Sequence, residues 1–177
     1  MLSLRPYKPC DASAVVSWIT DEVSFYQWSA GRFGPYPLTP KRLNDHYDSF
    51  ADSDAFFVFT AYDETGTVGQ VMMRFLDAQK TVLRFGFIIV DAKKRGKGYG
   101  ARMLSLALDY AFSFLHVEKV TLGVFANNPA AEKCYRSLGF RDAGAPDHSS
   151  ILGEEWLCLE LEQTKADWRQ SQSGGML

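Results

Sequence analysis

The part of the chain that most constrains its fold runs from Phe87 to Phe140. It begins with the short apolar segment Phe87–Val90, which is typical of a buried strand, and continues into a turn with three closely spaced glycines. Residues that favour helix then predominate over Ala101–Leu115, where one face is shared by Leu104, Leu108, Ala111 and Leu115. A second strand is predicted over Lys119–Phe125, where β-branched and apolar residues gather. This order of strand, turn, helix and strand predicts an α/β fold.

The glycine-rich turn is a candidate phosphate site. Glycines let a ligand approach the backbone, several N–H groups point outward, and the dipole of the following helix adds partial positive charge. The turn does not match the P-loop pattern, because Lys97 is followed by Gly98 rather than Ser or Thr. It does not match the dinucleotide fingerprint either, since its glycines are spaced G-x-G-x-G. An anionic ligand other than a common nucleotide is therefore expected.

The pattern that remains is Arg95-x-x-Gly98-x-Gly100, which resembles the acetyl-coenzyme A turn of the GNAT superfamily of N-acetyltransferases. The second half of that family's pattern follows at the expected distance, because Asn128–Phe140 matches N-x-x-A-x-x-x-Y-x-x-x-G-F throughout. The resemblance is specific over residues 82–140 and diffuse elsewhere. It implies an enzyme that moves an acetyl group from acetyl-CoA to a primary amine of a small molecule or a protein, by direct attack in a ternary complex.

The resemblance also implies roles for individual residues. Tyr135 occupies the position of a general acid that protonates the departing thiolate. Asn128 is expected to reach the cofactor arm, although capping of the last helix would explain it equally well. The backbone of the strand before the turn is expected to separate from its neighbour and bind the arm. The residues expected to contact acetyl-CoA are Ile88, Ile89, Val90, Arg95, Gly96, Lys97, Gly98, Tyr99, Gly100, Ala101 and Asn128.

The general base for the amine is not evident. Many relatives carry a glutamate on the strand before the turn, whereas Thr81–Val90 contains no acid. The proton can instead leave through ordered water, or through an acid of a neighbouring segment; the candidates are Asp21, Glu22, Glu154 and Glu155. The missing acid leaves a second function class open, a non-catalytic CoA-binding sensor. The presence of Tyr135 counts against that alternative.

Aromatic residues interrupt the helical periodicity between residues 21 and 38, among several glycines and prolines. Two interpretations are about equally supported. The segment is either an irregular loop that packs its rings on the core, or a wall of the acceptor pocket, where aromatic faces can hold a cationic amine. The candidates for substrate binding are Trp28, Phe33 and Tyr36.

Composition excludes several other classes of function. The formal net charge of −2 argues against a nucleic-acid binder, and no apolar run is long enough to cross a membrane. The beginning of the chain lacks the apolar core of a signal peptide. The three cysteines lack metal-ligand spacing, so no metal site is expected, and reduced thiols in the cytoplasm are favoured. A homodimer is possible by analogy alone.

The predicted architecture is a single GNAT-like α/β domain over residues 1–162, with a mixed sheet of about six or seven strands and about four helices. Residues 163–177 are expected to form a polar tail, disordered over Gln170–Gly175. The expected helices follow an N-cap at Asp11, Thr39 or Asn128, or cover Ala101–Leu115. The expected strands are Leu2–Pro6, Ala55–Tyr62, Thr67–Leu76, Thr81–Val90, Lys119–Phe125, Phe140–Ala143 and Glu155–Leu161.

Overall fold

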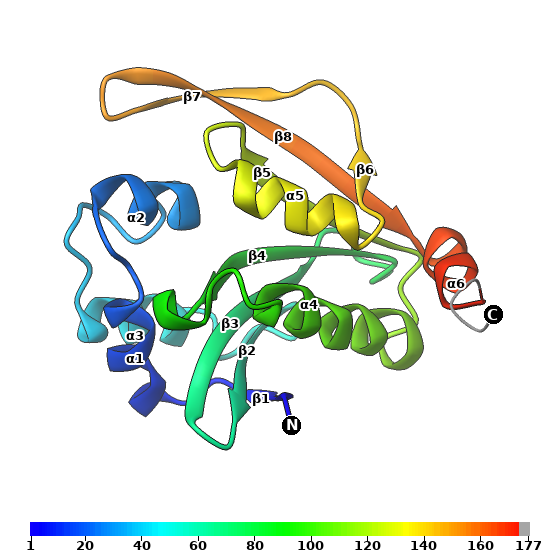
Figure 1. Ribbon diagram of the computed structural model, residues 1–177, viewed down its shortest axis with the longest axis horizontal. Helices are drawn as coiled ribbons and strands as arrows, with labels where there is room; N and C mark the ends of the chain where they lie inside the picture. The colour runs from blue at the N-terminus through cyan, green and yellow to red at the C-terminus, as the bar shows by residue number, and fades with distance from the viewer. Residues whose placement is uncertain (174–177) are drawn as a thin grey trace.

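The computed structural model describes residues 1–173 and has a mixed eight-stranded sheet at its centre (Figure 1). The strands are β1 (Ser3–Pro6), β2 (Phe56–Asp63), β3 (Gly66–Phe75), β4 (Val82–Val90), β5 (Lys119–Phe125), β6 (Arg141–Asp142), β7 (Asp147–Ile151) and β8 (Glu154–Thr164). The α-helices are α1 (Ala12–Ser17), α2 (Glu22–Ser29), α3 (Pro40–Asp48), α4 (Tyr99–Asp109), α5 (Pro129–Ser137) and α6 (Lys165–Ser173). A π-helical turn, Tyr110–Phe114, extends α4.

The strands lie in the order β1-β2-β3-β4-β5-β8-β6, and β7 also pairs with β8. The first four strands form an antiparallel meander, and α4 makes the crossover that brings β5 parallel to β4. The β4–β5 ladder is short, because its last register pair joins Arg84 to Thr121. Beyond that pair β5 provides no register partner for β4. This unpaired stretch between the two strands is called the β4–β5 gap below.

The two faces of the sheet carry separate hydrophobic clusters. On one face α4 packs Leu104 and Leu108 against strand residues such as Phe85. On the other face α1, α2 and α3 cover Phe87 and Ile89 of β4. Figure 1 shows α1, α2 and α3 gathered on the left of the sheet, with the β7–β8 hairpin reaching beyond it at the top.

The alternation of β4 side chains between the two faces of the sheet breaks at Phe87. Its φ of 45° is positive, and the pairing with β3 shifts between Gln70 and Met72. Such an irregularity is a β-bulge, which turns consecutive side chains to the same face and bends the strand. As a result Phe87 and Ile89 lie on the α2 side, whereas Ile88 and Val90 pack against the α4 side.

The predicted α/β class with a mixed sheet is confirmed, although the structure has eight strands and six α-helices rather than six or seven strands and four helices. The irregular loop predicted between residues 21 and 38 is partly wrong, because it contains α2. Aromatic residues are weak helix formers, but Asp21 and Ser24 form a capping box and Phe25 is fully buried. Tertiary packing therefore decides this helix.

Two predictions near the ends of elements are corrected. Disorder over Gln170–Ser173 is wrong, since α6 reaches Ser173; Gly174 and Gly175 lie outside the described residues. The Thr164 hydroxyl caps the start of α6 by accepting from the Asp167 N–H, and Trp168 packs its ring 5.2 Å from that of Phe112. The unpredicted strand β7 is polar, and its pairing with β8 defines it.

Asp11 precedes α1 but its carboxylate does not cap that helix. It is 3% exposed, forms an ion pair with Arg5 at 2.7 Å, and accepts a hydrogen bond from Thr60 at 2.8 Å. Hydrogen bonds and the guanidinium lower its pKa against the opposing effect of burial. The predicted caps at Thr39 and Asn128 are confirmed, because each accepts a hydrogen bond from a backbone N–H of the first turn.

Within residues 1–173 no helix combines the length and the apolar character needed to cross a bilayer.

Candidate functional site

The gap between β4 and β5 is the first part of the site. β4 stays paired with β3 as far as Val90, which is the partner of Gly69, so that edge is occupied. Its other edge has no register partner on β5 beyond Arg84. Peptide groups of β4 on that side therefore have no ladder partners on β5, which is what a ligand that pairs with the strand edge requires. Ile88, Ile89 and Val90, which the sequence assigned to cofactor binding, lie along this stretch.

The glycine-rich turn closes one end of the gap. Gly96 and Gly98 have φ of 72° and 77°, a backbone conformation that favours glycine, and a Cβ on either residue would meet no heavy atom within 4 Å. The first helical bond of α4 runs from the Arg102 N–H to the Gly98 carbonyl at 3.1 Å. The N–H groups of the three residues before Arg102 are therefore free of helical partners. Free N–H groups at a helix start, next to glycines with open space beside them, are an arrangement that can bind an anion.

The long helix begins two residues earlier than predicted, with Gly98 as its N-cap, so Tyr99 and Gly100 belong to its first turn. Gly100 also makes a close approach possible. A Cβ there would lie 3.6 Å from Sγ of Cys134 on α5 and 3.8 Å from a methyl group of Val90. The start of α4 is thus held between β4 and α5.

Arg95 fixes the turn through its side chain. Its Nη2 donates to the Trp18 carbonyl at 2.7 Å, and its Nε donates to the Val90 carbonyl at 3.1 Å. The guanidinium therefore connects the turn to the end of β4 and to the residue that follows α1. In this structure the side chain holds the turn in place, whereas contact with an anion is left to the backbone.

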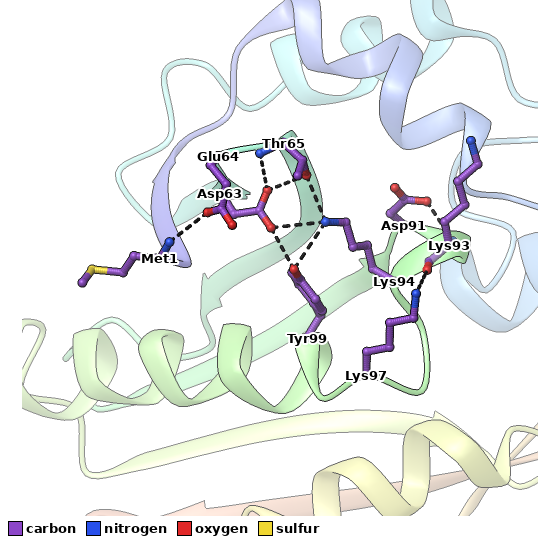
Figure 2. Close-up of polar contacts among 9 residues, drawn as sticks. All are labelled: Met1, Asp63, Glu64, Thr65, Asp91, Lys93, Lys94, Lys97 and Tyr99. Carbon is purple, nitrogen blue, oxygen red and sulfur yellow. Dashed lines mark hydrogen bonds and ion pairs between the residues drawn. The ribbon is translucent and has the colours of Figure 1, made fainter.

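A polar cluster behind the turn, shown in Figure 2, attaches it to the β2–β3 hairpin. The Asp63 carboxylate, 4% exposed, accepts hydrogen bonds from the Tyr99 hydroxyl at 2.9 Å and from Lys94 at 3.3 Å. It also accepts from the Thr65 hydroxyl at 2.6 Å. These donors hold the pKa of Asp63 well below its usual range. Lys94 and the Tyr99 side chain thus serve the scaffold, and Lys97 donates to the Lys93 carbonyl at 3.0 Å.

Tyr135 lies on α5 with its ring 6.4 Å from that of Phe140. The residue is 6% exposed, and its hydroxyl forms no hydrogen bond with any of the described residues. Burial, and then the neighbouring Cys134, raise the pKa of the phenol. The hydroxyl is therefore protonated at neutral pH and available to donate to a ligand.

Asn128 caps α5, because its side-chain oxygen accepts from the Ala131 N–H at 3.3 Å. The preceding residue takes part in another contact. Nε2 of Gln27 on α2 donates to the Asn127 carbonyl at 2.9 Å. This bond joins the helical cover of one half of the sheet to the loop that follows β5, across the open end of the gap.

An aromatic cluster lines the face of the sheet that α2 covers. Trp28 stacks on Phe33 with ring centres 4.9 Å apart, and Phe33 lies 4.6 Å from Phe87 and 4.5 Å from His46. Of the three predicted substrate-binding aromatics, Trp28 and Phe33 meet in this cluster. Tyr36 instead packs against Phe25 at 5.7 Å.

Phe87 and His46 were missed as members of this cluster. Gly86 next to Phe87 is the kind of signal that marks a bulge in a strand, and it was available in the sequence. His46 lies on α3, and nothing in its sequence surroundings indicates its contacts. Burial, and then Arg32, lower the pKa of this imidazole, so it is neutral at pH 7.

The candidate bases lie in different settings. Asp21 caps α2 by accepting from the Ser24 N–H at 2.7 Å, which lowers its pKa and weakens it as a base. Glu155 lies 3.1 Å from His148 on the exposed β7–β8 hairpin. Glu160, which was not predicted, pairs with Arg84 on the face that carries the aromatic cluster. Among residues 1–173, no group of three acidic, histidine or cysteine side chains is placed to hold a metal ion.

The family model of the Acetyltransferase (GNAT) family matches residues 22–140, which is more than half of the chain. The chain belongs to the GNAT family. The predicted resemblance is thus confirmed, and the matched range includes the β4–β5 gap, the glycine-rich turn and Tyr135.

Curated relatives of this GNAT chain match over shorter stretches. Spermidine N(1)-acetyltransferase of Vibrio cholerae is 37% identical over 57 residues, covering 32% of this chain and 33% of that protein. The Escherichia coli enzyme of the same name is 35% identical over 85 residues, 45% of this chain and 46% of that one. N-acetylaspartate synthetase of Rattus norvegicus is 43% identical over 68 residues, 36% and 21% of the two chains. These three alignments span less than half of each relative's length.

The GNAT fold is also evident from solved structures. The crystal structure of spermidine N-acetyltransferase from Vibrio cholerae in complex with CoA and spermine superposes with a TM-score of 0.80, covering 95% of this chain and 98% of that one. At 21% sequence identity the match establishes the fold.

Proposed function

We propose that this chain is an N-acetyltransferase that uses acetyl-CoA to acetylate a primary amine of a small molecule. The observation that carries the proposal is the continuity of the open β4 edge with the glycine-rich turn and the start of α4. The N–H groups from Gly96 to Ala101 bind the pyrophosphate, and the peptide groups of β4 bind the pantetheine arm. The proposed donor site therefore extends from the glycine-rich turn along β4 to the middle of the sheet.

The reaction proceeds by direct attack. The amine nitrogen forms a bond to the thioester carbonyl carbon, and the C–S bond of the resulting tetrahedral intermediate then breaks. Backbone N–H groups near Ile88 and Ile89 stabilise the negative charge on the carbonyl oxygen. The thiolate takes a proton from the hydroxyl of Tyr135, and the amine loses its proton to ordered water or to an acid of a neighbouring segment.

The raised pKa of Tyr135 is compatible with this role. Low polarity around the phenol also surrounds the sulfur, and burial raises the pKa of a thiol as it does that of a phenol. Because both pKa values rise together, the difference between the phenol and the thiol changes less than the pKa of the phenol does. A protonated phenol stabilises the developing thiolate by hydrogen bonding before the proton moves.

The acceptor approaches from the face covered by α2, where Trp28, Phe33 and Phe87 form an apolar wall. The alternative of a non-catalytic sensor has no support among the relatives, whose names describe acetyltransferases or a synthetase. The same names favour a small-molecule acceptor over a protein amine. Self-association and a cytoplasmic location stay predictions.

Acetyl-CoA is expected to raise the melting temperature of the protein. A ligand at about 100 times its Kd adds about 2.7 kcal/mol to the free energy of unfolding. For a chain of this length that corresponds to a shift of roughly 5–10 °C. Differential scanning fluorimetry measures it, with ATP and NAD as control ligands. An unchanged melting temperature in millimolar acetyl-CoA would remove the proposal.

Asp63→Ala is expected to raise the KM for acetyl-CoA several-fold and to leave the rate at saturating acetyl-CoA nearly unchanged. The substitution removes the acceptor that holds Lys94 and Tyr99 behind the turn, so the turn loses its fixed position. Asp45→Ala is the matched control, because it breaks an exposed ion pair with Lys41 on α3. Steady-state kinetics of both variants test this, and equal KM values would contradict it.

A further inference from the structure

Two arginines lie on the acceptor face of the sheet, and a third, Arg32, follows α2 next to the aromatic cluster. Arg74 on β3 and Arg84 on β4 are direct cross-strand partners, so their side chains lie on the same face. The preceding residue on β3, Met73, belongs to the core under α4, which places Arg74 on the opposite, acceptor side. Arg32 is adjacent in sequence to Phe33, which contacts Phe87 and His46.

Only one of these arginines is neutralised. Arg84 forms two parallel hydrogen bonds with the Glu160 carboxylate, at 2.7 and 2.8 Å. Arg32 and Arg74 are exposed, and neither guanidinium forms a hydrogen bond or an ion pair with any side chain or carbonyl in residues 1–173. By contrast, exposed Arg136 on α5 is paired with two acids, Glu132 and Asp142.

The charges of this group act on one another. Partial desolvation, followed by the charges of Arg32 and Arg84, lowers the pKa of Arg74. The charge of Arg32 also contributes to the lowered pKa of His46 in the aromatic cluster. The acids nearby are Glu160, which is already paired, and Asp147, whose charge acts on Arg84. Positive charge therefore exceeds negative charge along the rim of the acceptor wall.

The distance along β4 between the aromatic cluster and the arginines fits a small acceptor. Phe87 and Arg84 are three residues apart on β4, which is roughly 10 Å of strand. Arg74 lies beside Arg84, and its flexible side chain covers part of that distance. An amine placed at the gap and a negative group a few bonds away can thus reach the reacting end and the arginines together.

We infer that the acceptor of this enzyme carries a carboxylate beside its amine, and that Arg32 and Arg74 bind this carboxylate. The inference rests on the proposed function and names its substrate class: an amino acid or a short derivative of one. A guanidinium binds a carboxylate through two parallel hydrogen bonds, and two unpaired guanidinium groups on one rim offer such a site. A polyamine, which carries only positive charge, would be repelled by the same rim.

The curated relatives include both chemistries, since their names refer to spermidine and to N-acetylaspartate. Sequence identity alone does not choose between them. The two unpaired arginines favour the carboxylate-bearing class.

The test measures CoA thiol release with matched acceptors: amino acids, their carboxamides, and spermidine or spermine. A lost charge-assisted hydrogen bond corresponds to about a 10–100-fold change, so each amino acid is expected to exceed its amide by that factor in kcat/KM. Arg74→Gln and Arg32→Gln are expected to raise the KM for the amino acid at least tenfold and to leave the KM for acetyl-CoA unchanged. Arg141→Gln is the control, since Arg141 is 75% exposed on β6.

Preference for polyamines, or unaltered amino-acid kinetics in both arginine variants, would overturn the inference while leaving the proposed function intact. A binding measurement covers the case in which no acceptor turns over. Glutamate, added with CoA, is expected to raise the melting temperature of the wild-type protein and not that of Arg74→Gln. Equal shifts in both proteins, or none in either, would also overturn it.

Discussion

Tyr135→Phe is expected to lower the single-turnover rate of acetyl transfer by about 10²–10⁴, the usual contribution of a positioned general acid. The ring keeps its packing against Phe140, and only the hydroxyl is lost. The affinity for acetyl-CoA should barely change, because the hydroxyl acts chiefly as the thiolate forms. Stability should also change little, since the hydroxyl bonds to none of the described residues.

Rapid-quench measurement of product with enzyme in excess tests this without interference from product release. Tyr110→Phe is the matched control, because Tyr110 packs on Phe59 and Phe114 away from the gap. An undiminished single-turnover rate in Tyr135→Phe would make Tyr135 a packing residue. Water would then be the proton donor.

Gly98→Val is expected to weaken acetyl-CoA binding by about 10–10³-fold, which corresponds to losing one or two hydrogen bonds to a charged group. The branched side chain would occupy the open space beside the turn, where we propose that the pyrophosphate binds. The positive φ of 77° would also be strained for valine, which disturbs the start of α4.

Gly153→Val separates these two effects. Gly153 has the same φ of 77°, and a Cβ there also meets no atom within 4 Å, but it lies in the β7–β8 turn. Both variants should lose similar stability, and only Gly98→Val should lose affinity in isothermal titration calorimetry with acetyl-CoA. Wild-type affinity in Gly98→Val would mean that the turn does not bind the phosphates.

Features encoded locally were predictable from the sequence. The glycine-rich turn, the caps at Thr39 and Asn128, and the strands of the meander each depend on neighbouring residues. The helix α2 was not predictable in this way, because its aromatic residues disfavour helix and burial of Phe25 compensates. The polar strand β7 likewise depends on its partner β8.

The parts of the site that escaped prediction join residues far apart in the chain. Arg95 bonds to the carbonyl of Trp18, 77 residues away, and no pattern around either residue indicates this contact. Arg32 and Arg74 likewise share a rim only because α2 lies over the sheet. The proposed donor side of the site rests on sequence motifs, whereas the proposed acceptor side depends on the tertiary fold.

The length of the β4–β5 gap also bears on where the donor is positioned. The stretch of β4 without a β5 partner, Phe85–Val90, is roughly 20 Å long, and the glycine-rich turn closes one end. In the proposed complex an extended donor arm takes the place of a missing strand there, and peptide groups would bind any amide-bearing chain of suitable width. The depth of the donor in the gap is therefore set by its phosphates, which in the proposed complex bind at the glycine-rich turn. A shortened thioester without them can enter the slot, but nothing would stop it at the depth where Tyr135 meets the sulfur.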